Sequence, residues 1–286
     1  MKLIRFSSGG SIHVGVAAGG RAHRLSDLVP GSPGSLKEVL AEGQPLLQAI
    51  EAALPRATGG VPLDQVRLEA PIPDPQKYMA IGLNYEDHAE ETRRAGLPVP
   101  TVQLWFNKQV TCVVGPYDDV HKPRASLKVD YEAELGVVIG KRCRHVAEAD
   151  ARTVVGGYFV ANDVSARDWQ LASPTFTLGK SFDTHGPTGP WIVTPDEVPD
   201  PHNLQMRLTV NGEVRQQQNT GRMIHNIWRQ IAHLSTVMTL MPGDLIATGT
   251  CAGVGIASNR FLQPGDVVRV EIDGIGHIEN RIVPEP

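Results

Sequence analysis

Two glutamates lie two residues apart in the segment 130–136, with Glu132 and Glu134 on either side of an alanine. Residues two apart on a β-strand point to the same face, so a strand here would place both carboxylates side by side. Two close carboxylates repel each other unless a cation or a shared proton lies between them. Oxygen ligands suit Mg²⁺, Mn²⁺ or Ca²⁺. The pair therefore indicates a metal site, and a solvated charged strand edge is the alternative that the spacing leaves open.

A third carboxylate, Asp163, follows the apolar segment 157–161. A lone aspartate at such a place is often a turn former, but it would also complete a partly open metal site. Arg167 and Gln170 come next, three residues apart, and on a helix they would share a face. The guanidinium fork binds carboxylates well. The same pair is equally typical of an exposed helix surface.

His88 and Glu91 are also three residues apart, in a segment expected to be helical. A carboxylate bound to one ring nitrogen orients a histidine as a general base. Because this segment is crowded with acidic residues, a solvated acidic face is the alternative. Lys180 is not a phosphate-loop lysine, since Pro174 stands where that loop requires glycine. The sequence also has no GxSxG nucleophile elbow.

The elements that must position these residues fall into two groups. Residues 1–72 are expected to form a small N-terminal β-rich domain, with a strand at 12–16 and helical pieces within 36–54 that break at Pro45. The segment 71–75 has the composition of a stiff, extended linker. Residues 73–286 are then expected to form the larger, catalytic domain.

In the larger part, Asn84 is expected to cap a helix that ends at Gly96, and Ser165 to open a capping box with Asp168. Asn211-Gly212 predicts a hairpin turn. The remaining elements are strands at 77–83, 128–140 and 157–163, helices at 148–155 and 223–238, and strands after the Pro-Gly-Asp turns at Pro242 and Pro264. This pattern predicts a mainly β (α+β) fold, a twisted β-roll or sandwich with a few peripheral helices.

The composition narrows the classes of function. Of the 286 residues, 41% are hydrophobic and 20% are charged, which is ordinary for a globular protein, and the 29 Gly and 22 Pro favour many turns. The formal net charge of −4 gives no cationic field for nucleic acid. No apolar run is long enough for a membrane span, and the N-terminus lacks a signal-peptide core. The three cysteines are widely spaced, so we expect free thiols and a cytoplasmic protein.

Several motifs occur in an order that resembles the fumarylacetoacetate hydrolase family. The resemblance covers residues 78–283, and residues 1–70 look like the variable N-terminal part of longer members. The matching segments are Ile81-Gly82-Leu83-Asn84-Tyr85 with His88, residues 130–140, Asn162-Asp163-Val164-Ser165-Ala166-Arg167-Asp168, Gly179-Lys180-Ser181-Phe182-Asp183-Thr184 with Gly186-Pro187, Pro242-Gly243-Asp244, and Thr248-Gly249-Thr250.

This resemblance implies a role for each candidate residue. The metal ligands would be Glu132, Glu134 and Asp163, holding Mg²⁺ or Mn²⁺, which Ca²⁺ can replace in crystals. His88 and Glu91 would form a water-activating dyad on a lid helix, and Lys180 would stabilise an enolate or leaving group. Arg167, Gln170 and Thr250 would bind the substrate's oxygens. Cys251 departs from the proline that family members commonly carry after Thr-Gly-Thr. The family fold is a β-sandwich roll, and its members are usually homodimers.

The reaction that the resemblance implies is metal-dependent hydrolysis of a C–C bond in a small 2,4-dioxo acid of the acylpyruvate or fumarylpyruvate type, through a metal-stabilised enolate, as in the catabolism of aromatic compounds. Oxaloacetate decarboxylation and isomerisation or hydration of a 2-hydroxy-diene-dioate could use the same site. Two other classes remain open: a non-catalytic metal- or ligand-binding protein, and a non-haem iron oxygenase built on His88, His121 and a carboxylate.

Overall fold

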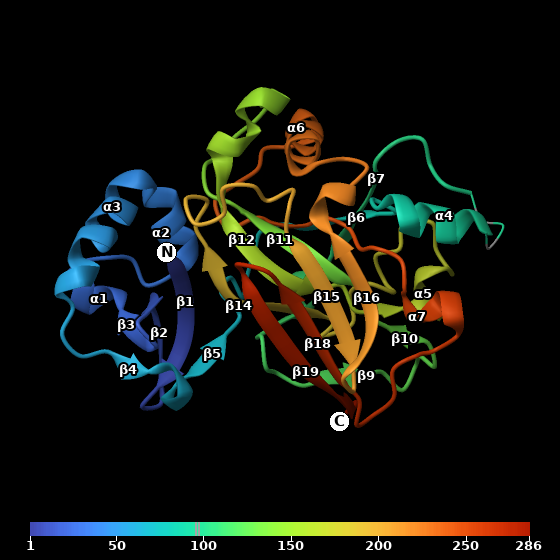
Figure 1. Cartoon of the computed structure of the whole chain (residues 1–286), viewed down its shortest axis with the longest axis horizontal. Coiled ribbons are helices and arrows are strands. Elements are labelled where there is room, and N and C mark those ends of the chain that lie inside the picture. The colour runs from blue at the N-terminus through green and yellow to red at the C-terminus, as the bar shows by residue number, and fades with distance from the viewer. Residues whose placement is uncertain (95, 97) are drawn as a thin grey trace.

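β-Strands make up most of the regular secondary structure, and the largest sheet contains twelve of them. A computed structural model describes residues 1–94, 96 and 98–286 (Figure 1). Ten strands follow the order β4-β3-β2-β1-β14-β12-β11-β17-β6-β7, with β5 beside β1 and β8 beside β14. The twelve strands of this sheet are β1 (Lys2–Ser8), β2 (Ser11–Ala18), β3 (Arg21–Arg24), β4 (Val61–Pro62), β5 (Arg67–Glu69), β6 (Tyr78–Gly82), β7 (Leu104–Lys108), β8 (Val113–Val114), β11 (Ala133–Ile139), β12 (Val155–Asn162), β14 (Gly186–Val193) and β17 (Leu245–Ala247).

A second sheet packs against the central strands of the first. Leu135 of β11 and Val160 of β12 share one buried cluster with Leu208, Val270 and Ile278 of the second sheet. The two sheets therefore form the sandwich that the sequence predicts. The five strands run in the order β16-β15-β18-β19-β9, and the pair β10-β13 stands apart. The strands of this sheet and of the pair are β9 (Val120–Lys122), β10 (Val129–Asp130), β13 (Ser165–Ala166), β15 (Gln205–Val210), β16 (Glu213–Asn219), β18 (Val267–Ile272) and β19 (Gly276–Pro284).

The N-terminal residues join the same large sheet. β1 pairs antiparallel with β14, and its Leu3 lies opposite Ile192. The N-terminal helices cover the other face of this sheet, since Leu36 and Ile50 share a buried cluster with Phe159 of β12. Strand β11 is thus buried on both faces, which explains its run of apolar residues. The helices are α1 (Leu25–Leu28), α2 (Leu36–Glu42) and α3 (Gln44–Ala53), with the 3₁₀ turns η1 (Leu54–Arg56) and η2 (Leu63–Gln65).

The break between the two N-terminal helices lies two residues before the position that the sequence predicts. The helices separate at Gly43, which has a φ of 70°, and not at Pro45. Pro45 lies in the first turn of α3, where its missing N–H has no helical partner to lose. Gly43 supplies the left-handed conformation that ends α2.

Two predicted helix caps are wrong. Asn84 does not cap the helix after it, because its side chain instead donates to the carbonyl of Thr248 at 2.7 Å and accepts from the backbone N–H of His225 at 2.8 Å. Ser165 lies in strand β13, and the short helix α5 (Arg167–Gln170) begins after Ala166 without a side-chain cap. The Asn84 side chain thus joins distant segments, whereas the Ser165 hydroxyl donates locally to the carbonyl of Asp163 at 2.8 Å.

The predicted hairpin in the larger part is confirmed, and one predicted helix is present with a later start. Asn211 and Gly212 both have positive φ, of 53° and 80°, and join β15 to β16 as a hairpin. Helix α6 begins later than predicted, because Asn226 caps it by accepting from the N–H of Arg229. No helix in the part of the chain that the structure describes could cross a membrane. The remaining helices are α4 (Glu86–Arg94), η3 (Val110–Cys112), η4 (Glu148–Val154), η5 (Thr220–Arg222), α6 (Ile227–Val237) and α7 (Gly255–Ser258).

Candidate metal centre and active site

The three carboxylates predicted as metal ligands meet at one end of the β11–β12 pair. Glu132 immediately precedes β11, Glu134 lies on it, and Asp163 immediately follows β12. Antiparallel pairing places Ala133 opposite Asn162, which brings these strand ends together. One carboxylate oxygen from each acidic residue lies within 4.8 Å of the others, and all three side chains are buried. A cluster of carboxylate oxygens of this kind can hold a hard divalent cation.

Two lysines neutralise part of the charge on this triad. Nζ of Lys180 lies 2.7 Å from Oε2 of Glu132 and 2.7 Å from Oδ2 of Asp163. Nζ of Lys108 donates to Oδ1 of Asp163 at 2.6 Å. Lys180 was predicted at this site, whereas Lys108 was not, because a single lysine at the end of an apolar strand gives no local signal. Its role depends on a contact 55 residues away in the sequence.

Glu132 and Glu134 differ in their electrostatic surroundings. Burial raises the pKa of Glu132, but the charges of Lys180 and Arg167 outweigh it and hold that pKa at about 2. Burial, together with the charges of Asp163 and Glu132, raises the pKa of Glu134 well above its usual range. The backbone N–H of Gly249 donates to Oε2 of Glu134 at 2.7 Å. The site thus carries a buried carboxylate whose negative charge still needs a counter-charge, which a divalent cation would supply.

Arg167 and Gln170 are both buried on α5, as the spacing predicts. Nη1 of Arg167 donates to Oε1 of Gln170 at 2.8 Å, and Nη2 lies 2.7 Å from Oε1 of Glu132. Nε of Arg167 donates to Asp130, a residue without a predicted role. Asp130 also accepts from the backbone N–H groups of Gly255 and Ile256, at 2.6 Å and 2.9 Å. Arg167 is therefore held in one orientation beside the triad.

The predicted dyad forms on α4, at the edge of the site. Nδ1 of His88 lies 3.0 Å from Oε2 of Glu91, and Oε1 of Glu91 accepts from the backbone N–H of Gly253 at 3.3 Å. His88 lies near enough to the triad for its charge, when the ring is protonated, to lower the pKa of Glu132. The dyad is less enclosed than the triad, and a cavity of about 510 Å³ opens beside α4. Its lining residues are Asp87, Glu90, Glu91, Arg94, Ala252 and Ala257.

The hydroxyl of Thr250 is bonded within the protein. It donates to the carbonyl of Ala133 and accepts from Nε2 of Gln216, each at 2.8 Å. Gln216 also accepts from the N–H of Ala133 and donates to the carbonyl of Cys251, so it ties the Thr250 loop to the start of β11. Sequence reasoning missed Gln216, since a lone glutamine on a strand has no recognisable pattern. The Thr250 side chain faces inward, and its predicted contact with substrate would require a change in these bonds.

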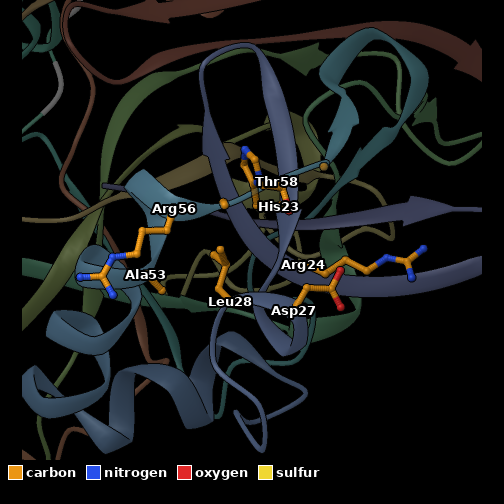
Figure 2. Close-up of a pocket in the computed structure, with 9 residues that line it drawn as sticks. His23, Arg24, Asp27, Leu28, Ala53, Arg56 and Thr58 are labelled. Carbon is orange, nitrogen blue, oxygen red and sulfur yellow. The ribbon is translucent and has the colours of Figure 1, made fainter.

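A second cavity, of about 310 Å³, lies within the N-terminal residues and does not share the features of the triad (Figure 2). The guanidinium groups of Arg24 and Arg56 extend to opposite sides there, and the carboxylate of Asp27 lies beside Arg24. Polar groups do not converge on one point, as they do at the triad. The chemistry is therefore assigned to the β11–β12 end of the large sheet.

Comparison with known proteins identifies the family. Residues 77–283 match the family described as "Fumarylacetoacetate (FAA) hydrolase C-terminal", and residues 1–71 match "Rv2993c-like, N-terminal". The chain therefore belongs to the fumarylacetoacetate hydrolase family, and its fold is the α+β fold of that family with a small N-terminal β domain.

Relatives of known name resemble the chain over nearly its whole length. It is 40% identical to the mitochondrial oxaloacetate tautomerase FAHD2A of Bos taurus over 291 residues, which covers 99% of this chain and 92% of the relative. The crystal structure of maleylpyruvate hydrolase from Sphingobium sp. SYK-6, in complex with manganese(II) and pyruvate, is 36% identical with a TM-score of 0.85 and full coverage of both chains. Fumarylacetoacetate hydrolase from Exiguobacterium antarcticum is 35% identical, with a TM-score of 0.83 and full coverage of both chains. The chain is thus an enzyme of this family with a buried acidic triad that can hold a metal.

Proposed function

We propose that this protein is a metal-dependent hydrolase that cleaves a C–C bond in a small 2,4-dioxo acid of the acylpyruvate type. The observation that carries the proposal is the pairing of two features in one site. A buried acidic triad stands beside Lys180, and the His88–Glu91 dyad lies near it on α4. Enolisation alone needs no activated water, whereas hydrolysis requires a base that removes a proton from water.

The substrate's pyruvate end is assigned to the triad. A divalent metal held by Glu132, Glu134 and Asp163 would supply Lewis-acid polarisation of the 2-oxo group. Nε and Nη1 of Arg167 each donate one N–H within the protein, and Nη2 forms an ion pair with Glu132 without a hydrogen bond, so N–H groups on Nη1 and Nη2 are left for the substrate carboxylate. The ammonium of Lys180 would donate to the oxygen on which negative charge develops.

The dyad is assigned to the water. With Nδ1 bound to Glu91, the other ring nitrogen of His88 is left to accept a proton from water. The water oxygen would add to the carbonyl carbon distal to the pyruvate unit, and the bond between that carbon and C3 would then break. C3 takes a proton, so the products are a carboxylic acid and pyruvate or a close relative. A pyruvate product and a divalent metal are supported by the similar maleylpyruvate hydrolase structure, which contains manganese(II) and pyruvate.

A second candidate is keto–enol isomerisation of oxaloacetate, with decarboxylation of the same acid as a related outcome. The 40% identity to an oxaloacetate tautomerase favours it. Isomerisation and decarboxylation both pass through an enol or enolate of a 2-oxo acid. Neither needs water activated by His88, so the dyad separates these reactions from hydrolysis.

The test is a comparison of substrates on metal-stripped protein. Acetylpyruvate, maleylpyruvate, fumarylpyruvate and oxaloacetate are offered with and without Mg²⁺ or Mn²⁺, and pyruvate release and enol absorbance are followed. Metal-dependent pyruvate release from an acylpyruvate supports the hydrolase. Loss of enol absorbance from oxaloacetate without release from any acylpyruvate contradicts it and favours the tautomerase.

A further inference from the structure

A second lysine contacts the triad through the other oxygen of Asp163. Lys108 is the last residue of β7, and its side chain is fully buried. Its ammonium donates to Oδ1 of Asp163 at 2.6 Å, to the carbonyl of Val164 at 3.4 Å, and to the carbonyl of Lys180. A lysine ammonium has three N–H donors, and here each has an acceptor within the protein.

We propose that Lys108 is a positioning residue of the site: it fixes the Asp163 carboxylate for metal binding and fixes the backbone of Lys180. The expected change in kcat rests on the proposed function, whereas the expected change in Mn²⁺ affinity does not depend on it. All three N–H groups of Lys108 are used within the protein, so none remains for the substrate. Lys108 therefore acts through Asp163 and Lys180 and not on the reacting atoms.

The first argument concerns the charge on Asp163. The structure gives this carboxylate two cationic partners, Lys108 on Oδ1 and Lys180 on Oδ2. When Lys180 turns towards a substrate, Lys108 still balances the buried negative charge. Without Lys108, the metal would be the one cation left on Asp163 among these partners, and removal of one partner from a buried charge is strongly unfavourable. Lys108 thus allows Lys180 to change partners while Asp163 keeps its orientation.

The second argument concerns the connection of three segments. Lys108 ends β7, Asp163 and Val164 follow β12, and Lys180 belongs to the segment between α5 and β14. The Lys108 side chain links all three at one buried point. Partners behind a metal ligand orient it, and their loss typically weakens metal binding by about 10–100-fold. A small shift of the Lys180 backbone would also misplace its ammonium.

The experiment measures Mn²⁺ affinity by calorimetry or by electron paramagnetic resonance, on the full chain stripped of metal. Lys108→Met keeps the length and apolar stem of the side chain and removes its charge and donors. We expect its Mn²⁺ dissociation constant to rise by about 10–100-fold. At saturating Mn²⁺ we expect KM for an acylpyruvate to recover, while kcat stays about tenfold lower because the Lys180 backbone is no longer held.

The matched control is Lys77→Met, which breaks another lysine–aspartate pair. Nζ of Lys77 lies 3.0 Å from Oδ2 of Asp244, outside the triad. This variant tests the loss of a partly buried ion pair, and we expect Mn²⁺ affinity within about twofold of the parent protein. Lys108→Arg retains a positive charge and N–H donors, and we expect it to restore most of the affinity lost in Lys108→Met.

Two results would overturn the inference. One is a folded Lys108→Met protein that binds Mn²⁺ within twofold of the parent. The other, decisive if Lys108→Met does not fold, is a folded Lys108→Gln protein, which lacks the positive charge, that binds Mn²⁺ as tightly as the parent. If every acylpyruvate proves inert, the hydrolase proposal fails, but the Mn²⁺ affinities still decide the role of Lys108.

Discussion

The site has two halves that are built in different ways. The inner half, made of the triad with Lys108, Lys180 and Arg167, is buried and joined by contacts between segments far apart in the sequence. The outer half, the His88–Glu91 dyad, lies on one nine-residue helix, and its side chains are 12% and 26% exposed. Among the residues that the structure describes, the backbone N–H of Gly253 anchors Glu91 from outside the helix.

This difference suggests a division of labour. In the proposed function, the inner half would bind the part of a substrate that every 2-oxo acid shares, and its charge pairs are buried. The outer half would supply the step that separates hydrolysis from enolisation. A change in the inner half should therefore stop every reaction of the site, whereas a change in the outer half should be selective.

Replacement of Glu134 is expected to have the largest effect. Glu134→Ala removes one oxygen ligand and leaves the N–H of Gly249 without its acceptor, so we expect loss of Mn²⁺ binding and a fall in turnover of more than about 10³-fold on every substrate. Calorimetry and pyruvate release measure both. Glu134→Gln, which keeps the shape of the side chain, serves as the control for packing. Metal-dependent turnover that persists in both variants would remove Glu134 from the metal site.

Replacement of His88 is expected to be selective. His88→Ala should lower hydrolysis of an acylpyruvate by about 10²–10⁴-fold, because the base for water is lost. Enolisation or decarboxylation of oxaloacetate should fall much less, and Mn²⁺ affinity should stay nearly unchanged. The control is Glu90→Gln on the same helix, since Glu90 pairs outward with Arg93 and Arg94. Equal losses in hydrolysis and enolisation would contradict a water-activating dyad.

In both halves, the sequence predicts the contacts that depend on local spacing. The His88–Glu91 pair and the Arg167–Gln170 pair follow from helical spacing, and the structure brings each pair together as predicted. The alternation along β11 predicts that Glu132 and Glu134 lie together, although the strand begins only at Ala133. Each of these signals is local.

The features that sequence reasoning missed depend on long-range contacts. Lys108 and Gln216 have no local pattern, and their partners lie at least 30 residues away. Asn84 has the residue type of a cap, but a buried asparagine with four hydrogen-bonding positions is used to join three segments. The continuation of the N-terminal strands into the large sheet depends on the β1–β14 pairing, which spans about 190 residues of sequence.

The inner half should also make the protein sensitive to acid. His185 is fully buried next to this region, with Nε2 3.0 Å from the carbonyl of His121. Burial, reinforced by the charge of Lys108, lowers the pKa of His185 to about 3. The unfolded chain binds a proton below pH ~6.5, whereas the folded chain does not until pH ~3. The stabilising contribution is therefore complete above pH 6.5 and falls by up to about 1.4 kcal/mol per pH unit as the pH decreases towards 3.

Urea unfolding from pH 7.5 to pH 4.5 measures this effect. His185→Gln keeps a polar side chain that can donate to the carbonyl of His121 but cannot titrate, so its stability should depend less steeply on pH than that of the parent. The control His145→Gln changes a histidine at an exposed position, and the pH dependence should stay as in the parent. Identical slopes for His185→Gln and the parent would show that acid acts elsewhere.

The smallest effect is expected at Cys251, between the two halves. Burial raises the pKa of this thiol to about 12, so at pH 8 only about one molecule in 10⁴ carries the thiolate. Cys251 should therefore react with iodoacetamide far more slowly than an exposed thiol. Cys251→Ala should lower stability by about 1 kcal/mol through the small cavity that it leaves. The turnover of Cys251→Ala should stay within about threefold of the parent, which corresponds to about 0.7 kcal/mol in the activation free energy. The reason is that the hydrogen bonds from Gln216 to Thr250 and to the carbonyl of residue 251 remain. A larger loss in kcat with unchanged Mn²⁺ affinity would mean that the thiol itself aligns the Thr250 loop with the dyad.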